Sequence, residues 1–179
     1  MKKTKGLLVL IAFISVIQVS LGQTSFTEQK AGHIYTLSVP NYMAKTFTLN
    51  DVASMQYHNA AKNAYLVVID DTKEELEMKG IKFGSLKEFH DENIKQLSAE
   101  ENMPTESGQT EFTINGNKFY QSQLSVTLKE EGSADVKITY LVTYVETKDY
   151  YYQVLCWSLT SDFKSLLGDF KKIAASLKD

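Results

Sequence analysis

The three histidines of the chain are its first candidates for metal binding or acid–base chemistry. They are His33, His58 and His90, which lie 25 and 32 residues apart. A compact metal motif such as His-Glu-x-x-His places two ligands one helical turn apart, and no pair here has that spacing. The sequence therefore predicts no metal ion and no other cofactor. We expect the helical His90 at the surface or at a boundary position.

A cluster of acidic residues offers a second kind of chemistry. It consists of Asp70, Asp71, Glu74, Glu75 and Glu77. Calcium prefers carboxylate oxygens, but an EF-hand loop alternates its ligands around a central glycine. Apolar residues interrupt this cluster at helical spacing, so we interpret it as a strand end followed by a solvated helix face. Weak calcium binding between Asp70 and Glu77 stays open.

No nucleophile motif accompanies these residues. The sequence contains no Gly-x-Ser-x-Gly elbow, and the segment 80–84, Gly-Ile-Lys-Phe-Gly, lacks the context of a phosphate-binding loop. The single cysteine, Cys156, lies in an apolar stretch without basic neighbours, so we expect a small buried side chain and no reactive thiolate. We predict no catalytic residues, although a hydrolase built on two distant carboxylates stays open.

The run Tyr150, Tyr151 and Tyr152 is the most distinctive feature of the sequence. Alternate side chains of a strand point to opposite faces, which separates Tyr151 from its two neighbours. Tyrosines at a strand start can bury their rings while the hydroxyls stay in water. The alternative is a tentative partner or ligand surface made by these three residues. Trp157, on the Tyr151 face, is expected in the core.

The elements that position these residues begin with short strands and two helices. Strands are predicted at 34–39, 46–49, 53–58 and 65–70. The continuous apolar run within the last of them indicates a strand covered on both faces. A short helix begins after Thr72 and a longer one after Ser85, each with a glutamate three residues on, as in a capping box.

The second half of the chain predicts an antiparallel meander closed by a helix. Strands are expected at 109–114, 118–128, 134–145 and 150–159, with connections too short for a crossover helix. Asn115-Gly116 is a strong hairpin signal. From an N-cap at Ser161, apolar residues recur at i, i+3, i+4 and i+7, which favours a helix packed on the sheet. The predicted fold class is α+β, an antiparallel β-sheet flanked by helices.

Residues 1–22 have the pattern of a secretory signal peptide. Three lysines in the first five residues precede an apolar stretch of about eleven residues, too short to span a bilayer. Small residues place the cleavage between Gly22 and Gln23, and no lipid-anchor cysteine follows. We expect an exported, periplasmic or secreted protein, soluble and without stable membrane insertion, with a loose lead-in at 23–33 and one domain at 34–179. The alternative is an uncleaved N-terminal anchor.

The composition of the mature chain argues against nucleic acid as a partner. Removing the three lysines of residues 1–22 leaves 16 lysines against 22 acidic residues, a net charge of −6, and the chain has no arginine. Nucleic-acid readers depend on basic surfaces and on the bidentate guanidinium of arginine. One cysteine cannot form an internal disulfide, so an exported form must rely on packing.

Two segments resemble the PsbP-like superfamily, which has the Mog1/PsbP fold. The first, residues 35–43, is Tyr-Thr-Leu-Ser-Val-Pro-Asn-Tyr-Met, a strand running into a proline turn. The second, residues 150–178, joins an aromatic strand containing Trp157 to a Ser-Asp-Phe helix start and a closing Phe-Lys-Lys-Ile-x-x-Ser-Leu-Lys helix. The resemblance, to bacterial exported members of unknown function, implies an α/β/α sandwich. Members are mostly non-enzymatic accessory or binding proteins, and no functional residue carries over.

These observations favour an exported, non-catalytic accessory or binding protein of a bacterial cell envelope, and not an enzyme. Its partner is then another envelope protein or a small apolar ligand. Two alternatives stay open: a small-molecule or lipid carrier with an apolar pocket between sheet and helix, and an unrecognised hydrolase. A pocket of several hundred Å³ would favour the carrier.

Overall fold

The computed structural model describes residues 23–31, 35–100, 104–129, 132 and 134–179. The expected signal peptide, with Gly22 at its end, lies outside these residues, whereas Gln23 is described and exposed. Within the described ranges, no helix combines the length and the apolar character that a membrane crossing requires.

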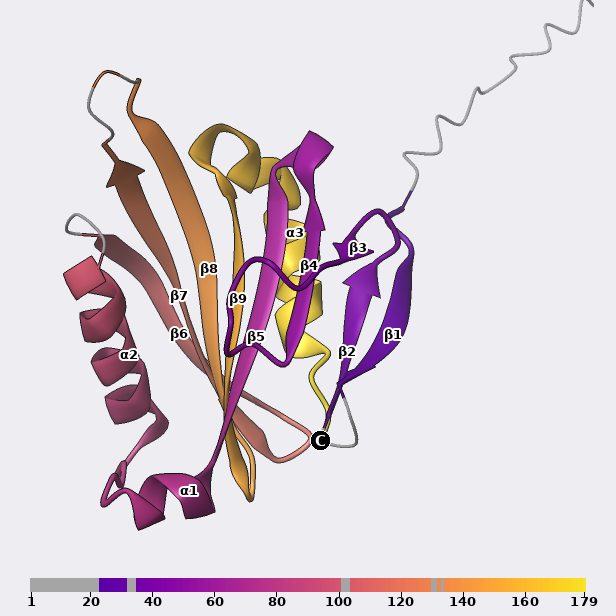
Figure 1. Ribbon diagram of the computed structural model, residues 1–179. Helices are drawn as coiled ribbons and strands as arrows, with labels where there is room; N and C mark the ends of the chain where they lie inside the picture. The colour runs from indigo at the N-terminus through magenta and orange to yellow at the C-terminus, as the bar shows by residue number, and fades with distance from the viewer. Residues whose placement is uncertain (1–22, 32–34, 101–103, 130–131, 133) are drawn as a thin grey trace, which may run out of the picture.

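The strands build one seven-stranded antiparallel sheet and one two-stranded hairpin (Figure 1). They are β1 (Phe26–Ala31), β2 (Tyr35–Pro40), β3 (Ala44–Lys45), β4 (Met55–Asn59), β5 (Ala64–Thr72), β6 (Thr105–Ile114), β7 (Asn117–Leu128), β8 (Val136–Glu146) and β9 (Tyr150–Leu159). The large sheet has the order β3-β4-β5-β9-β8-β7-β6, and β1 pairs with β2. The interior strand β5 buries Leu66, Val67 and Val68, as its apolar run predicts.

Helices lie on both faces of the large sheet. They are α1 (Lys73–Met78), α2 (Leu86–Glu100) and α3 (Thr160–Ala175). Figure 1 shows α2 on one side of the sheet, and α3 with the β1–β2 hairpin on the other. The predicted α+β class, an antiparallel sheet flanked by helices, is confirmed.

The α3 side of the sheet holds the larger core. Phe170 and Ile173 of α3 are completely buried there, together with Leu37 of β2. The end of the chain ties the hairpin to this layer, because the N–H of Thr36 donates to the carbonyl of Lys178 at 2.7 Å. The sheet covers one side of α3 and the hairpin covers another, so the apolar stripe of this helix is buried along its length.

The expected loose lead-in at 23–33 is wrong for its central part. Phe26–Ala31 form β1, which pairs with β2 along its whole length. Only Ala31 is fully buried, while Phe26 packs at the edge of the core. The outward side chains of this edge strand are mostly exposed and polar, which is why the sequence lacked a strand pattern.

The strand expected at 46–49 is also absent. Ala44–Lys45 pair with β4, the N–H of Thr46 donates to the carbonyl of Gln56 at 3.1 Å, and the chain then forms a loop that reaches the α2 side. The side chain of Gln56 holds this loop: its Oε1 accepts from the N–H of Leu49 at 2.8 Å and of Asn50 at 3.1 Å, and its Nε2 donates to the carbonyl of Asn50 at 2.6 Å. These bonds take the place of a strand ladder.

Local turn and cap signals hold at most positions. Asn115 and Gly116 have φ angles of 52° and 86°, as a two-residue hairpin turn requires. The hydroxyls of Thr72 and Ser85 each accept the backbone N–H three residues on, at 3.1 Å. The expected N-cap Ser161 instead lies inside α3, because β9 runs directly into the helix one residue earlier.

Candidate ligand-binding cleft

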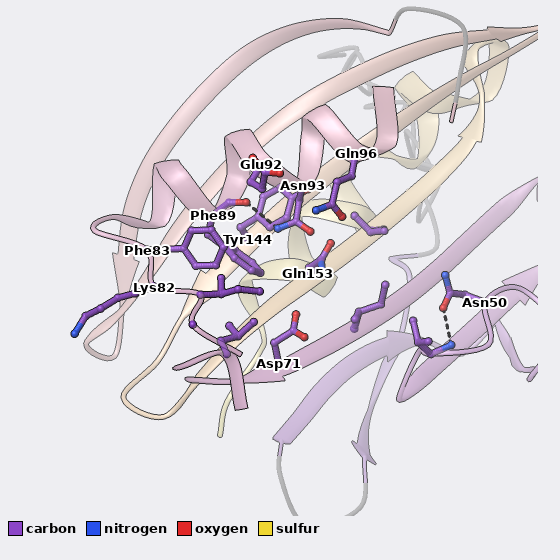
Figure 2. A pocket seen from close by; sticks show the side chains of 16 residues that line it. Asn50, Asp71, Lys82, Phe83, Phe89, Glu92, Asn93, Gln96, Tyr144 and Gln153 are labelled. Atoms are coloured by element: carbon purple, nitrogen blue, oxygen red, sulfur yellow. Dashed lines mark hydrogen bonds between the residues drawn. The ribbon is translucent and has the colours of Figure 1, made fainter. Parts of the chain in front are cut away.

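A cleft of about 820 Å³ lies on the α2 side of the sheet (Figure 2). Strands β5, β8 and β9 form its floor, α2 forms one wall, and the loop between β3 and β4 contributes Asn50 and Val52 to the other. The linker between α1 and α2, residues 79–85, closes one end with Ile81 and Phe83. Its volume lies in the range of small-molecule sites.

One stripe of α2 faces the cleft. Phe89, Glu92, Asn93 and Gln96 recur at i, i+3, i+4 and i+7, a spacing that places them on one side of a helix. Figure 2 shows Asn93 and Gln96 directed toward the floor. The Nδ2 of Asn93 donates to the carbonyl of Phe89 at 2.8 Å, which restrains this carboxamide. The wall therefore changes from aromatic to polar along the helix.

His90 anchors α2 to the sheet. Its side chain is 1% exposed, and its Nε2 lies 2.8 Å from Oε1 of Glu106 on β6. The ring centroid lies 4.4 Å from that of Tyr120 on β7. The expected surface or boundary position is therefore wrong, because β6 and β7 supply partners for the ring that the sequence around His90 does not reveal.

The contacts of His90 follow the acid–histidine–serine order of a catalytic triad, but the serine is not accessible to a substrate. Nδ1 lies 2.9 Å from Oδ1 of Asp91, and Nε2 lies 3.3 Å from Oγ of Ser122. A triad needs an exposed nucleophile whose proton passes to Nε2. Ser122 is completely buried in β7, and the Glu106 carboxylate meets the same ring nitrogen. This group is therefore a packing contact that holds the cleft wall in place.

Aromatic rings fill the closed end of the cleft. The Phe89 ring stacks on Tyr151 at a centroid distance of 4.6 Å, and Phe83 meets the Tyr151 ring edge-on at 5.8 Å. On the other side, Nζ of Lys73 lies 4.9 Å from the centroid of the Tyr151 ring. Lys73 also pairs with Glu146 at 3.0 Å. The α1–α2 linker is thus packed onto the sheet through these rings.

Asp71 supplies a carboxylate on the cleft floor. Figure 2 shows it next to Gln153, which hydrogen-bonds to it from β9. Burial raises the pKa of the Asp71 carboxyl, and the bond from Gln153 opposes that effect. Among the described residues, Asp71 forms no ion pair. Lys79 also lowers this pKa through its charge but lies outside ion-pair distance, so the floor holds a half-buried carboxylate without a directly paired cation.

The three tyrosines of β9 do not form one exposed patch. Tyr152 is completely buried, with its ring centroid 5.1 Å from that of Tyr35, and Tyr151 is buried beneath Phe89. Tyr150 is half-buried and stacks on Tyr152 at 5.7 Å. The interpretation as a partner surface does not hold for Tyr151 and Tyr152, because both faces are covered at this end of β9.

The other residues considered for metal chemistry are dispersed. His33 lies outside the described residues, and His58 is half-buried with its ring centroid 6.4 Å from that of Tyr65. In the part of the chain that the structure describes, no three histidine, cysteine or acidic side chains are grouped closely enough to hold a metal ion. The acidic cluster divides between the end of β5 and α1, where Glu77 pairs with Lys82 at 3.6 Å.

Cys156 and Trp157 have different environments. Cys156 is completely buried on the α3 side, as expected, and burial raises the pKa of its thiol far above the ordinary value. Trp157, expected in the core, is half-buried on the α2 side, where its ring stacks on Tyr65 at a centroid distance of 5.2 Å. The difference arises because the α2 side of β9 is only partly covered.

The carboxamide residues of the cleft were not identified from the sequence. They include Asn50, Asn93, Gln96 and Gln153, which come from the β3–β4 loop, α2 and β9. One signal existed: Gln153 interrupts the strand face that otherwise carries Tyr151 and apolar residues. A polar side chain at such a position marks either an edge or a site.

Comparisons with known proteins support the architecture. The sequence matches no protein-family model and no curated protein. The structure is similar to that of cyanobacterial PsbP (CyanoP) from Synechocystis sp. PCC 6803, with a TM-score of 0.62 and 11% identity, covering 89% of this chain and 95% of that one. It is also similar to the Ran-binding protein Mog1p of Saccharomyces cerevisiae, with a TM-score of 0.50 and 13% identity, covering 87% and 96%.

A third similar structure is PA94 from Pseudomonas aeruginosa, a protein of unknown function, with a TM-score of 0.50 and 11% identity over 86% of this chain and 96% of that one. Identities this low show the fold alone. The described residues form an antiparallel sheet with helices on both faces, and the alignments cover most of this chain and nearly all of each neighbour. The chain therefore has the Mog1/PsbP fold.

Proposed function

We propose that this protein is an exported, non-catalytic binding or accessory protein of a bacterial cell envelope, and that it holds its partner or ligand in the cleft beside α2. The observation that carries the proposal is the cleft itself, about 820 Å³ in volume, with an aromatic end and polar side chains on its floor and walls. A concave site with an apolar part and a few placed polar groups is the usual form of a binding site.

The neighbours with this fold agree with a binding role. One of them is described as a Ran-binding protein, and this chain shares its fold but only 13% of its residues. The similarity therefore supports binding in general and supplies no partner. Export rests on the signal-peptide pattern of residues 1–22, and mass spectrometry of the mature N-terminus tests it: a start at Gln23 supports export, and an intact Met1 contradicts it.

A small-molecule carrier is the second candidate, because the cleft has the volume of a ligand site. Its lining differs from the purely apolar pocket expected of a lipid carrier. Asp71, Glu92 and Gln153 contribute polar groups beside Ile69 and Leu155. A carried molecule would therefore need polar groups as well as an apolar part.

Blocking the cleft tests the proposal. Val52 is 73% exposed on the cleft wall, so Val52→Trp fills the mouth without disturbing the core. Val136 is 43% exposed and outside the cleft, which makes Val136→Trp the matched control. We expect the first variant to capture at least about tenfold less of its partner from a crosslinked envelope fraction, and the control to match the wild type.

Two results would contradict this function. One is full capture by the Val52→Trp variant when both variants are folded by near-ultraviolet circular dichroism. The other is turnover of ester, glycoside or peptide substrates by the mature protein, together with fluorophosphonate labelling of Ser122 or loss of turnover in Asp71→Asn. Either would favour the hydrolase alternative.

A further inference from the structure

The cleft is elongated along the sheet. Its floor includes Gln153 and Leu155 of β9, together with Ile69 and Asp71 of β5. Alternate residues of a strand lie roughly 6.6 Å apart, which is the spacing within each of these pairs. The α2 stripe from Phe89 to Gln96 runs beside them for about 10 Å. A ligand that fills this space is extended.

Four carboxamides surround the cleft, Asn50, Asn93, Gln96 and Gln153. Each carboxamide offers both hydrogen-bond donors and an acceptor, the same combination as a peptide group. They lie on both walls and on the floor, so a chain of alternating N–H and C=O groups would find partners on three sides. Asn50, Asn93 and Gln153 each form one hydrogen bond within the protein, to Val52, Phe89 and Asp71. Each keeps further donor or acceptor capacity, which a purely apolar chain would leave unused.

The charge of the cleft favours a cationic group. Asp71 is half-buried, and although the charge of Lys79 acts on it, no described cation lies within ion-pair distance of its carboxylate. The one lysine of the lining, Lys82, has a side chain that is 81% exposed and lies 3.6 Å from Glu77. Glu92 adds a second carboxylate on the wall. A ligand amine or guanidinium at Asp71 would supply the direct, charge-assisted hydrogen bonds that Lys79 does not make.

Two exposed apolar residues lie on different sides of the cleft. Val52 is 73% exposed on one wall, and Ile81 is 41% exposed on the linker at the closed end. These side chains offer apolar contact area next to the polar groups of the groove. They would pack against apolar side chains next to the cationic group.

The ring faces argue against a sugar as the ligand. Stacking on a sugar needs an accessible aromatic face, but the rings of Phe89 and Tyr144 in the lining are only 2% and 1% exposed. Phe83 of the lining makes edge-to-face contacts with Phe89 and Tyr151. These rings therefore present little open face to a sugar. We infer, resting on the proposed function, that the cleft binds an extended peptide segment of a partner protein, with a lysine or arginine side chain paired to Asp71.

Fluorescein-labelled heptapeptides of alternating threonine and leucine test this inference by fluorescence anisotropy. The central residue is lysine, arginine, glutamine or glutamate. We expect the lysine and arginine peptides to bind the mature protein at least about tenfold more tightly than the glutamine peptide, and the glutamate peptide to bind most weakly. Side-chain amide signals of Asn93, Gln96 and Gln153 should shift in NMR spectra on binding.

Charge variants test whether Asp71 is the residue that recognises the cationic side chain of the peptide. Asp71→Asn should abolish the preference for lysine and arginine over glutamine, while Asp135→Asn should retain it, because Asp135 is exposed and outside the cleft. A preference that persists in Asp71→Asn overturns the inference, and so does the absence of binding by any of the peptides.

Two further probes separate this inference from the proposed function. Maltohexaose and laurate are titrated under the same conditions. If either shifts the cleft amides and no peptide does, the peptide inference is wrong while a binding function of the cleft stands. If the peptides bind as expected but Val52→Trp still captures the envelope partner fully, the peptide site stands and the proposed function fails.

Discussion

The two faces of the sheet are built differently. On the α3 side, Phe170, Ile173 and Leu37 are completely buried in one continuous apolar core. On the α2 side, a smaller apolar cluster lies beside His90, and a cleft with Asp71 and carboxamides remains open. The comparison indicates that one face stabilises the fold and that the other is available for binding.

The energetic contrast follows from burial. Apolar area removed from water contributes about 25 cal/mol per Å², and the α3 side buries its side chains almost completely. A half-buried carboxylate such as Asp71 opposes folding, since burial disfavours its charge. A charged group that lowers the stability of the fold and lies in a cleft is a candidate functional residue.

The largest expected effect comes from the α3 side. Phe170→Ala removes a completely buried ring and should lower the free energy of unfolding by about 3–5 kcal/mol. Leu155→Ala on the cleft floor should cost only about 1–2 kcal/mol, because that side chain is half-buried. Urea denaturation of both variants measures the difference. Equal losses would contradict the division between the two faces.

An intermediate effect is expected where the α2 side is anchored. His90→Ala leaves Glu106 and the buried Ser122 without the imidazole and should cost about 1–3 kcal/mol. Hydrogen exchange should accelerate in α2 and not in α3, because His90 packs against β6 and β7. Uniform acceleration across both helices would show that the two faces unfold together.

The smallest expected effect has the opposite sign. Because the folded-state pKa of Asp71 is raised by burial, its ionised form destabilises the fold at neutral pH. Asp71→Asn should therefore be more stable than the wild type at pH 7, by less than about 1 kcal/mol for a partly solvated carboxyl.

The pH dependence of the stability difference between Asp71→Asn and the wild type is the control for this prediction. As the pH falls through the raised pKa, the wild-type carboxyl takes up a proton in the folded state first, and the advantage of Asp71→Asn should disappear below the ordinary pKa of aspartate. Thermal unfolding of both proteins from pH 7 down to about pH 3 measures this. A wild type that is more stable at pH 7 would show that the Asp71 charge is already compensated.

Several elements were predictable because their signals are local. The capping hydroxyls of Thr72 and Ser85 and the Asn115-Gly116 turn act within four residues, and each occurs in the structure. The apolar alternation of β9 also predicted its bounds, Tyr150–Leu159. The strand β1 was missed, because an edge strand with polar outward side chains lacks the periodic signal.

The amino-acid sequence by itself determined the α+β class, the antiparallel meander and the closing helix, because hydrophobic periodicity and turn chemistry are properties of short segments. Only the tertiary structure decided that His90 is buried and that Asp71, Asn93 and Gln153 border one cleft. Burial and proximity depend on which distant strands and helices pack together, and no short segment contains that information. The partial coverage of the α2 face therefore emerges only in the folded chain.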